Sequence, residues 1–471
     1  MVFSSMSFLF FFLPALIILY YLIPKRLREA RNLVLLVFSL FFYAYGGARF
    51  LLLMLVSIAV NYVCGLVAGG KHRQALRRWG VIAALVVGLG LLGWYKYAGF
   101  FAETLNRLGT GLPIPQVVLP IGISFFTFQG LSYVIDVYRG DAKVQRNPLR
   151  VALYISLFPQ LVAGPIVRYT TVAEEIGGRK ESLPEFTQGA VRLLFGLAKK
   201  MLIANAMGRV ADDIFSMNAA TLSAPVAWLG ALAYTAQIYF DFSAYSDMAI
   251  GLGRMFGFHF LENFEYPYIS RSIREFWRRW HISLSSWFRD YVYIPLGGSR
   301  CRVPRHIFNL FVVWLLTGLW HGASWNFVVW GLWFFVLLLG ERYLWGGLLE
   351  RLPGAARHVY TMLLIVIGWV FFRSDTMGNA LTYLGAMAGR GGSTGMATYY
   401  LLEYWPEWIA AVIACLPVKV ALERALDRRI ERPGYRALRV WGPRCLALVL
   451  LALSYMSLAT GAFNPFIYFR F

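Results

Sequence analysis

The stretch from Trp314 to Trp333, WLLTGLWHGASWNFVVWGLW, places one ionisable side chain, His321, inside an apolar run long enough to cross a membrane. Burying an imidazole in hydrocarbon without partners costs on the order of several kcal/mol. A histidine at membrane depth therefore indicates a functional site. The alternative is that His321, with Gly, Ser and Asn residues nearby, only hydrogen-bonds a neighbouring helix, and this stretch alone leaves both interpretations open.

Composition places the whole chain in a membrane. Of its 471 residues, 59% are hydrophobic and only 15% are charged, which is typical of an all-α polytopic membrane protein. The formal net charge of +21 comes from short Lys and Arg clusters between apolar runs, the pattern of cytoplasmic loops, so nucleic acid is not the expected partner. The cysteines are scattered and indicate neither a disulfide framework nor a metal site.

The order of apolar runs and basic clusters predicts the topology. Phe8–Ile23 has no basic residues before it and no cleavage pattern after it, so we interpret it as a retained helix. The basic residues that follow place its end in the cytoplasm and Met1 outside. The next run, Leu33–Ala68, is too long for one span, and Gly46 and Gly47 divide it into two helices.

Two segments carry helix-breaking residues inside apolar sequence. In LPIGISFFTFQGLSYVIDVYRG, Pro120, Gly122 and Gly130 interrupt a span, and Pro and Gly recur between Phe158 and Pro165. Irregular backbone at membrane depth persists only where protein or water satisfies its polar groups. These segments are candidate re-entrant or cavity-lining elements, or else ordinary kinked spans.

Later segments add further helices. Phe186–Phe215 is expected to be helical and to run obliquely, with its basic side chains, Lys200 among them, reaching lipid headgroups. Further spans are predicted near Tyr360–Phe372, Trp408–Leu422 and Cys445–Thr460. No long-period repeat is visible, which gives no support to a duplicated transporter.

A basic and aromatic segment, residues 268–305, is predicted to lie on the cytoplasmic face. Its arginines are interleaved with Trp277, Trp280 and Trp287, as in a helix that lies in the membrane interface. One interpretation is anchoring to lipid headgroups. The other is a cationic mouth for an anionic cofactor, because arginine offers bidentate contacts to phosphate.

The remaining polar residues suggest structural roles. Asp241 and Asp247 are six positions apart, so they do not share a helical face as an i, i+4 pair does. Each is expected to accept hydrogen bonds from Arg or from Tyr hydroxyls such as that of Tyr245. His281 is expected at the cytoplasmic approach and His321 deeper, and the sequence does not show whether they meet. The motifs of soluble hydrolases, zinc proteases and nucleotide hydrolases are absent.

Three long motifs together resemble a known family. QIYFDFSAYSDMAIGLGRMFGF, EFWRRWHISLSSWFRDYVYIPLGG and LWHGASWNFVVWG occur in this order and resemble the membrane-bound O-acyltransferase superfamily, in particular its bacterial alginate O-acetyltransferase branch. The likeness covers nearly the whole chain. It implies that His321 is the catalytic histidine and that His281 matches the family's second one. Ala244 replaces the glycine that is usual in the branch, a change that casts little doubt on activity.

The resemblance also implies a fold and a reaction. The expected fold is one integral membrane domain, residues 1–471, in which a ring of roughly eleven to thirteen helices surrounds a central funnel. His321 would act as the general base when a hydroxyl attacks the thioester of acetyl-CoA, the expected donor, since the ordinary pKa of imidazole suits that task. Residues proposed to bind the donor or to contact the oxyanion are Trp277, Arg278, Arg279, Trp280, Trp320 and Asn326.

No bound metal or permanent cofactor is expected. The expected location is the bacterial inner membrane, and the final acceptor is an exported polysaccharide reached through an extracytoplasmic SGNH-type partner. Phe466–Phe471 is a candidate docking element exposed to that partner. Peptidoglycan O-acetylation and D-alanyl transfer to teichoic acid remain alternatives within the superfamily. A transporter and a purely structural scaffold, in which His321 would be replaceable, remain alternatives outside it.

Overall fold

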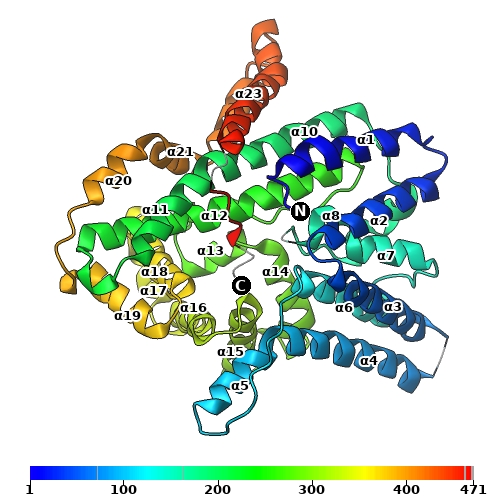
Figure 1. Cartoon of the computed structure of the whole chain (residues 1–471), viewed down its shortest axis with the longest axis horizontal. Coiled ribbons are helices and arrows are strands. Elements are labelled where there is room, and N and C mark those ends of the chain that lie inside the picture. Colours follow the sequence, from blue (N-terminus) through cyan, green and yellow to red (C-terminus); the bar gives the residue numbers. More distant parts are fainter. Residues whose placement is uncertain (72, 163, 461–462, 468–471) are drawn as a thin grey trace. The chain divides into compact units, whose positions relative to one another are not determined.

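The structure is a computed structural model that describes residues 1–71, 73–162, 164–460 and 463–467. Within this part of the chain the regular secondary structure is helical, without strands (Figure 1). Among the described residues, five apolar stretches of helix are long enough to cross a membrane: Arg49–Gly69, Gln74–Asn106, Val303–His321, Gly354–Arg373 and Pro433–Ala459. The prediction of an all-α polytopic membrane protein is confirmed.

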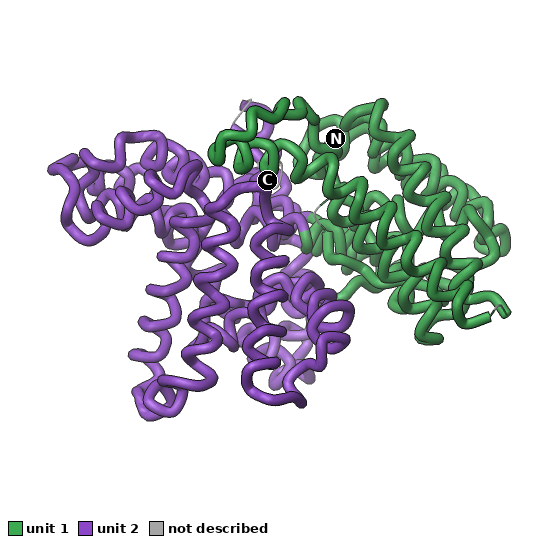
Figure 2. Tube along the Cα trace, turned by 90° about the horizontal axis from the view of Figure 1, so that it is seen from below, with its two compact units in different colours: residues 1–193, 246–261 green, residues 194–245, 262–471 purple. Residues whose placement is uncertain are grey.

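The chain forms two compact units, coloured separately in Figure 2. Unit 1 consists of Met1–Leu193 and Ser246–Leu261, and unit 2 of Leu194–Tyr245 and Glu262–Phe471. Helices α10 and α12 contribute residues to both. The sequence predicted one domain in which a ring of helices surrounds a central funnel. This prediction concerns how the two units are arranged relative to each other, so it stays a prediction.

Unit 1 contains most of the N-terminal helices. Their bounds are η1 Phe8–Phe12, α1 Leu13–Leu22, α2 Arg28–Tyr45, α3 Arg49–Gly69, α4 Gln74–Leu92, η2 Gly93–Tyr97, α5 Ala98–Asn106, α6 Ile123–Arg139, α7 Pro148–Ser156, α8 Phe158–Leu161, α9 Tyr169–Gly178 and the start of α10, Leu183–Ala198. Helix α3 packs on α4 and α6, and α2 packs on α7. The predicted division of the second apolar run at Gly46 and Gly47 is confirmed, because α2 ends before them and α3 begins after them.

Helix α6 corrects one prediction. It begins after Gly122, whose φ of 76° favours glycine, but it continues through Gly130 without a break. A Cβ built at Gly130 would collide with the side-chain amide of Asn61 on α3. Gly130 therefore allows close packing of two helices, which sequence alone does not distinguish from a break.

The second interrupted segment is irregular, as predicted. The short helix α8 is buried over its whole length. Ser39 Oγ accepts a hydrogen bond from the Phe158 amide at 3.1 Å, and Gln160 Nε2 donates to Tyr154 O at 2.5 Å. Neighbouring groups thus supply partners for the Phe158 amide and for Gln160 Nε2, whereas Gln160 Oε1 has none among the described residues. Ala163 lies outside the described residues, and a re-entrant course through a membrane stays a prediction.

Unit 2 contains the remaining helices. These are η3 Lys199–Ala204, α11 Asn205–Ser216, η4 Ala219–Thr221, α12 Ala224–Met255, η5 Pro267–Ile269, α13 Ile273–Arg279, α14 Ile282–Phe288, η6 Arg289–Tyr293, α15 Val303–His321, α16 Trp325–Tyr343, α17 Gly346–Arg351, α18 Gly354–Arg373, α19 Met377–Gly385, η7 Ala386–Arg390, α20 Ala397–Glu403, α21 Trp405–Cys415, α22 Val418–Asp427 and α23 Pro433–Ala459. Helix α16 packs along α15 on one side and α18 on another.

Two expectations in these later segments need correction. Phe186–Phe215 is helical, but Lys200 is buried inside unit 2 and does not reach a lipid headgroup. The predicted span Trp408–Leu422 is interrupted, because α21 ends at Cys415 and α22 begins only after Pro417. Proline lacks the amide hydrogen that would continue the helix.

A buried charge cluster joins the α1–α2 connection of unit 1 to the segment before α10. Glu181 accepts hydrogen bonds from Tyr20 and Arg28, and Arg31 lies 3.0 Å from the same carboxyl. Burial alone raises the pKa of the Glu181 carboxyl, but the hydrogen bonds from Arg28 and Tyr20 outweigh it and lower the pKa from 4.5 to about 2. The ionised carboxylate is therefore the form that holds the cluster together.

We expect Glu181→Gln to destabilise the protein by about 3–5 kcal/mol, because removing one partner of a buried ion pair leaves uncompensated charge. Thermal unfolding of purified protein in detergent measures the change. The contribution of Glu181 is complete above about pH 4.5 and is lost as pH falls from 4.5 toward 2.

The matched control is Glu29→Gln, which removes an exposed partner of Arg150 and should cost about 0–1 kcal/mol. Equal losses in the two variants would contradict the role given to the buried cluster.

Candidate functional site

His321 is the last residue of α15, at a sharp change of backbone direction. Gly322 follows in an extended conformation, and α16 begins three residues later. The imidazole is buried, with ring centroids 4.8 Å from Trp330 and 5.2 Å from Phe372. The turn between α15 and α16 thus places the histidine among aromatic side chains inside unit 2.

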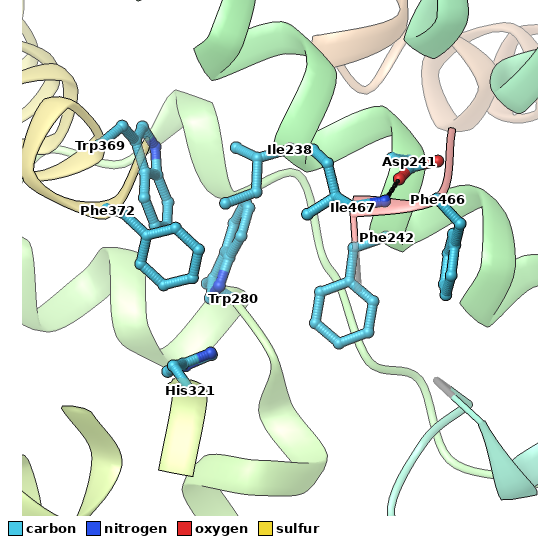
Figure 3. A pocket seen from close by; sticks show the side chains of 9 residues that line it. All are labelled: Ile238, Asp241, Phe242, Trp280, His321, Trp369, Phe372, Phe466 and Ile467. Atoms are coloured by element: carbon cyan, nitrogen blue, oxygen red, sulfur yellow. Dashed lines mark hydrogen bonds between the residues drawn. The ribbon is translucent and has the colours of Figure 1, made fainter. Parts of the chain in front are cut away.

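A small cavity of ≈ 20 Å³ opens beside His321, which is room for about one water-sized group. Figure 3 shows the imidazole at the end of its helix, near Trp280 and Phe372. The lining residues are Ile238, Asp241, Phe242, Trp280, His321, Trp369, Phe372, Phe466 and Ile467. Apart from His321 and Asp241, the walls are apolar or aromatic.

Asp241 and Asp247, the two aspartates of α12 that the sequence singled out, each form an ion pair. Asp241 Oδ1 lies 2.6 Å from Lys200 Nζ, and both side chains are almost completely buried. The sequence predicted a tyrosine or arginine partner for Asp241, so its lysine partner is a correction. Asp247 pairs with Arg192 at 2.7 Å, the residue type expected. Tyr245 is buried, with its ring 4.9 Å from that of Phe466.

His281 precedes α14 and is held in a left-handed conformation, with φ 45° and ψ 54°. Its Nδ1 lies 3.1 Å from Asn263 Oδ1, whereas its buried Nε2 has no hydrogen-bond partner among the described residues. The ring lies 4.6 Å from Phe242 and is only 1% exposed. His281 is therefore a buried residue of unit 2, where the sequence had suggested an entrance.

Trp320 connects the two histidines, a relation that the sequence left open. Its ring centroid lies 5.7 Å from that of His281 and 5.0 Å from that of His321. Replacing one of these three rings would therefore disturb the packing of the others.

Four of the six residues predicted to bind the donor or contact the oxyanion, residues 277–280, lie in different surroundings. Trp280 lines the cavity, and Trp277 packs against Trp314, at 4.7 Å, so neither ring is free to anchor in lipid headgroups. Arg279 pairs with Glu275. Only Arg278, of the four, is exposed.

Asn326 lies near the start of α16, and its side-chain amide donates a hydrogen bond of 2.5 Å to Ser374 O. It is not among the described residues that line the cavity, so an oxyanion contact stays a prediction. No cluster of three or more His, Cys, Asp or Glu side chains that could hold a metal ion occurs in the described part of the chain.

The cavity also contains residues that sequence reasoning did not assign. Trp369 and Phe372 lie in the segment GWVFFRSD, residues 368–375. The sequence of this segment does not show that it lies close to His321 in the fold. The C-terminal segment is a correction: Phe466 and Ile467 were expected to be exposed, but both are buried. Residues 468–471 of that predicted docking element lie outside the described residues.

This arrangement suits proton transfer. An imidazole has one nitrogen that can accept a proton and one that can donate it, and the aromatic walls exclude bulk water from the step. The cavity leaves room next to the ring for a small reacting group.

Comparison with known proteins gives a consistent result. Residues 143–350 match the family described as MBOAT, membrane-bound O-acyltransferase. The chain is 40% identical over 505 residues to "Probable alginate O-acetylase AlgI" of Azotobacter vinelandii, with 100% of each chain covered. It is 34% identical over 425 residues to "Peptidoglycan O-acetyltransferase" of Helicobacter pylori, covering 83% of this chain and 80% of that protein.

A more distant likeness is to "Teichoic acid D-alanyltransferase" of Bacillus subtilis. It is 30% identical over 275 residues, which cover 55% of this chain and 68% of that protein. The matched family segment contains both His281 and His321.

Proposed function

The chain belongs to the membrane-bound O-acyltransferase family, and from that premise we propose that it moves acetyl groups from cytoplasmic acetyl-CoA across the membrane for O-acetylation of an exported polysaccharide such as alginate. Because it belongs to this family, the chain is a multi-pass membrane acyltransferase. This result argues against the alternative that the chain is a transporter. The observation that carries the proposal is the buried imidazole of His321 beside a small aromatic cavity.

In the proposed reaction His321 is the general base. Its imidazole takes the proton from an acceptor hydroxyl while the hydroxyl oxygen attacks the thioester carbonyl. The new C–O bond forms, the C–S bond breaks, and the departing thiolate of CoA receives the proton from the imidazolium. The oxygen acetyl ester and free CoA are the products, and no electrons are gained or lost.

The final acceptor is reached through a relay. An extended polysaccharide would lose much of its hydration in a cavity of ≈ 20 Å³ lined by aromatic rings. We therefore place the first acceptor hydroxyl on a small carrier or on an extracytoplasmic SGNH-type partner. The proposed location is the bacterial inner membrane, with Met1 outside and residues 268–305 on the cytoplasmic face.

Alginate is favoured as the polymer because two relatives with that name align over the entire chain, whereas the peptidoglycan relative covers 83% of it. The peptidoglycan alternative rests on the relative in Helicobacter pylori. Both candidate polymers can be tested by deleting the gene. Ester-linked acetate is then measured separately on the exported polysaccharide and on peptidoglycan. Loss from the polysaccharide alone supports the proposal, and loss from peptidoglycan alone would replace it with the alternative.

Arg278 provides a test of donor binding. Arg278→Gln is expected to raise the KM for acetyl-CoA about fivefold with little change in kcat, because an exposed charge contact contributes about 1 kcal/mol. Initial rates in membrane vesicles at varied donor concentration measure the effect.

Arg107→Gln is the control, since this exposed arginine follows α5 and lies outside the basic segment 268–305. An unchanged KM in Arg278→Gln would assign the arginine to lipid headgroups.

A further inference from the structure

The last described segment of the chain forms part of the cavity wall. We name residues 463–467 the C-terminal strap. Phe466 and Ile467 both line the cavity that contains His321 and are buried, and Figure 3 shows Ile467 beside Asp241. The strap is irregular except for Ile467, so its backbone groups need partners from elsewhere.

Two buried side chains supply those partners. Asp241 Oδ2 accepts a hydrogen bond of 2.8 Å from the Ile467 amide. Lys200 Nζ donates to Pro465 O and lies 2.6 Å from Asp241 Oδ1. One ion pair therefore fixes the strap backbone at two positions, two residues apart.

Further contacts agree with this attachment. Asn205 Nδ2 lies 3.4 Å from Asn464 Oδ1, and the ring of Tyr245 lies 4.9 Å from that of Phe466. A Cβ built at Gly208 would lie 3.4 Å from the ring of Phe463. The strap is thus seated along η3, α11 and the part of α12 that belongs to unit 2.

Lys200 has a buried side chain in a π-helical turn. The turn is η3, between α10 and α11, and π-helical turns are frequent at functional sites. A buried ion pair is costly unless further hydrogen bonds use its remaining donors and acceptors. Here the strap backbone uses them.

We propose that Lys200 and Asp241 are positioning residues that hold the C-terminal strap as one wall of the His321 cavity, and that this wall restricts the cavity to a short acyl group. The second part rests on the proposed acyl transfer. The first part concerns the conformation of the chain and stands without it.

The first test measures exposure of the strap. Ile467→Cys is introduced into a protein whose four native cysteines are replaced, and its reaction rate with N-ethylmaleimide is measured in detergent. Lys200→Met with Asp241→Leu removes both charges together, so no unpaired charge is left buried. We expect this double variant to raise the labelling rate at least tenfold.

The matched control is Arg192→Met with Asp247→Leu, which removes an ion pair from α10 and α12 in unit 1. It should leave the labelling rate unchanged, and gel filtration establishes that both variants are folded. An unchanged rate in Lys200→Met/Asp241→Leu, or an equal rise in the control, would overturn the attachment of the strap.

The second test measures acyl selectivity. The ratio of acetyl to butyryl transfer should fall at least tenfold in Lys200→Met/Asp241→Leu, because a released wall admits the longer chain. A merely structural role would lower both rates by the same factor, and that result would overturn the restriction on acyl size. If the wild-type chain transfers neither group, the proposed function fails, while the labelling result still decides the positioning role.

Discussion

Replacing His321 with alanine should lower acetyl transfer by at least about 10³-fold, within the range that a positioned general base contributes. The side chain ends α15 and lies against Trp330 and Phe372, which continue to shape the site in the variant. The protein should therefore remain folded while the chemical step fails. The measurement is transfer of radiolabelled acetyl in membranes, normalised to the amount of folded protein.

His306→Gln is the matched control. His306 is a buried histidine on the same helix, where it contacts the hydroxyls of Tyr293 and Tyr343. Fifteen residues separate it from His321, about 22 Å along a helix. Transfer should persist in this control, and wild-type transfer in His321→Ala would refute the assignment of the base.

Gly318→Ala is expected to lower kcat by about 10²-fold although it touches no reacting group. A Cβ at this position would collide with the backbone oxygen of Phe327 on α16. Backbone cannot move aside as a flexible side chain does, so α15 and α16 must separate. His321 lies three residues later on α15, and a displacement of about 1 Å at a catalytic group can cost about 10²-fold.

Gly90→Ala is the control, because a Cβ at Gly90 on α4 would meet nothing within 4 Å. Removing a helix-interior glycine there should stabilise the protein by about 0.5–1 kcal/mol. Steady-state kinetics and thermal unfolding of the two variants separate the local clash from a general effect of alanine. Wild-type kcat in Gly318→Ala would show that the contact is not needed to place His321.

Sequence patterns predicted the features that depend on local chemistry. Apolar runs and basic clusters indicated the membrane class, and Gly46 and Gly47 marked a true helix boundary. The predicted break at Gly130 was wrong. The sequence does not distinguish a glycine that permits close helix packing from a glycine that breaks a helix, because the neighbouring helix must be known. Pro417 interrupts the predicted span Trp408–Leu422, because proline lacks the amide hydrogen that would continue the helix.

In the candidate site, too, local features could be predicted from the sequence and tertiary contacts could not. His321 stands out because an ionisable residue in an apolar run is unusual, whereas the pairing of Lys200 with Asp241 joins residues 41 positions apart (241 − 200). Such contacts depend on tertiary packing, as does the burial of Phe466 and Ile467. The basic neighbours of His281 suggested a place at the cytoplasmic entrance, but its own side chain is buried in unit 2.

The most direct test of the central claim uses sealed liposomes that contain the purified chain and radiolabelled acetyl-CoA only on the inside, with the extracytoplasmic partner protein only on the outside. The account predicts acetyl label on the external partner with the wild-type chain and almost none with His321→Ala. Equal labelling by the two proteins, or no labelling by either, would contradict transfer across the membrane by His321.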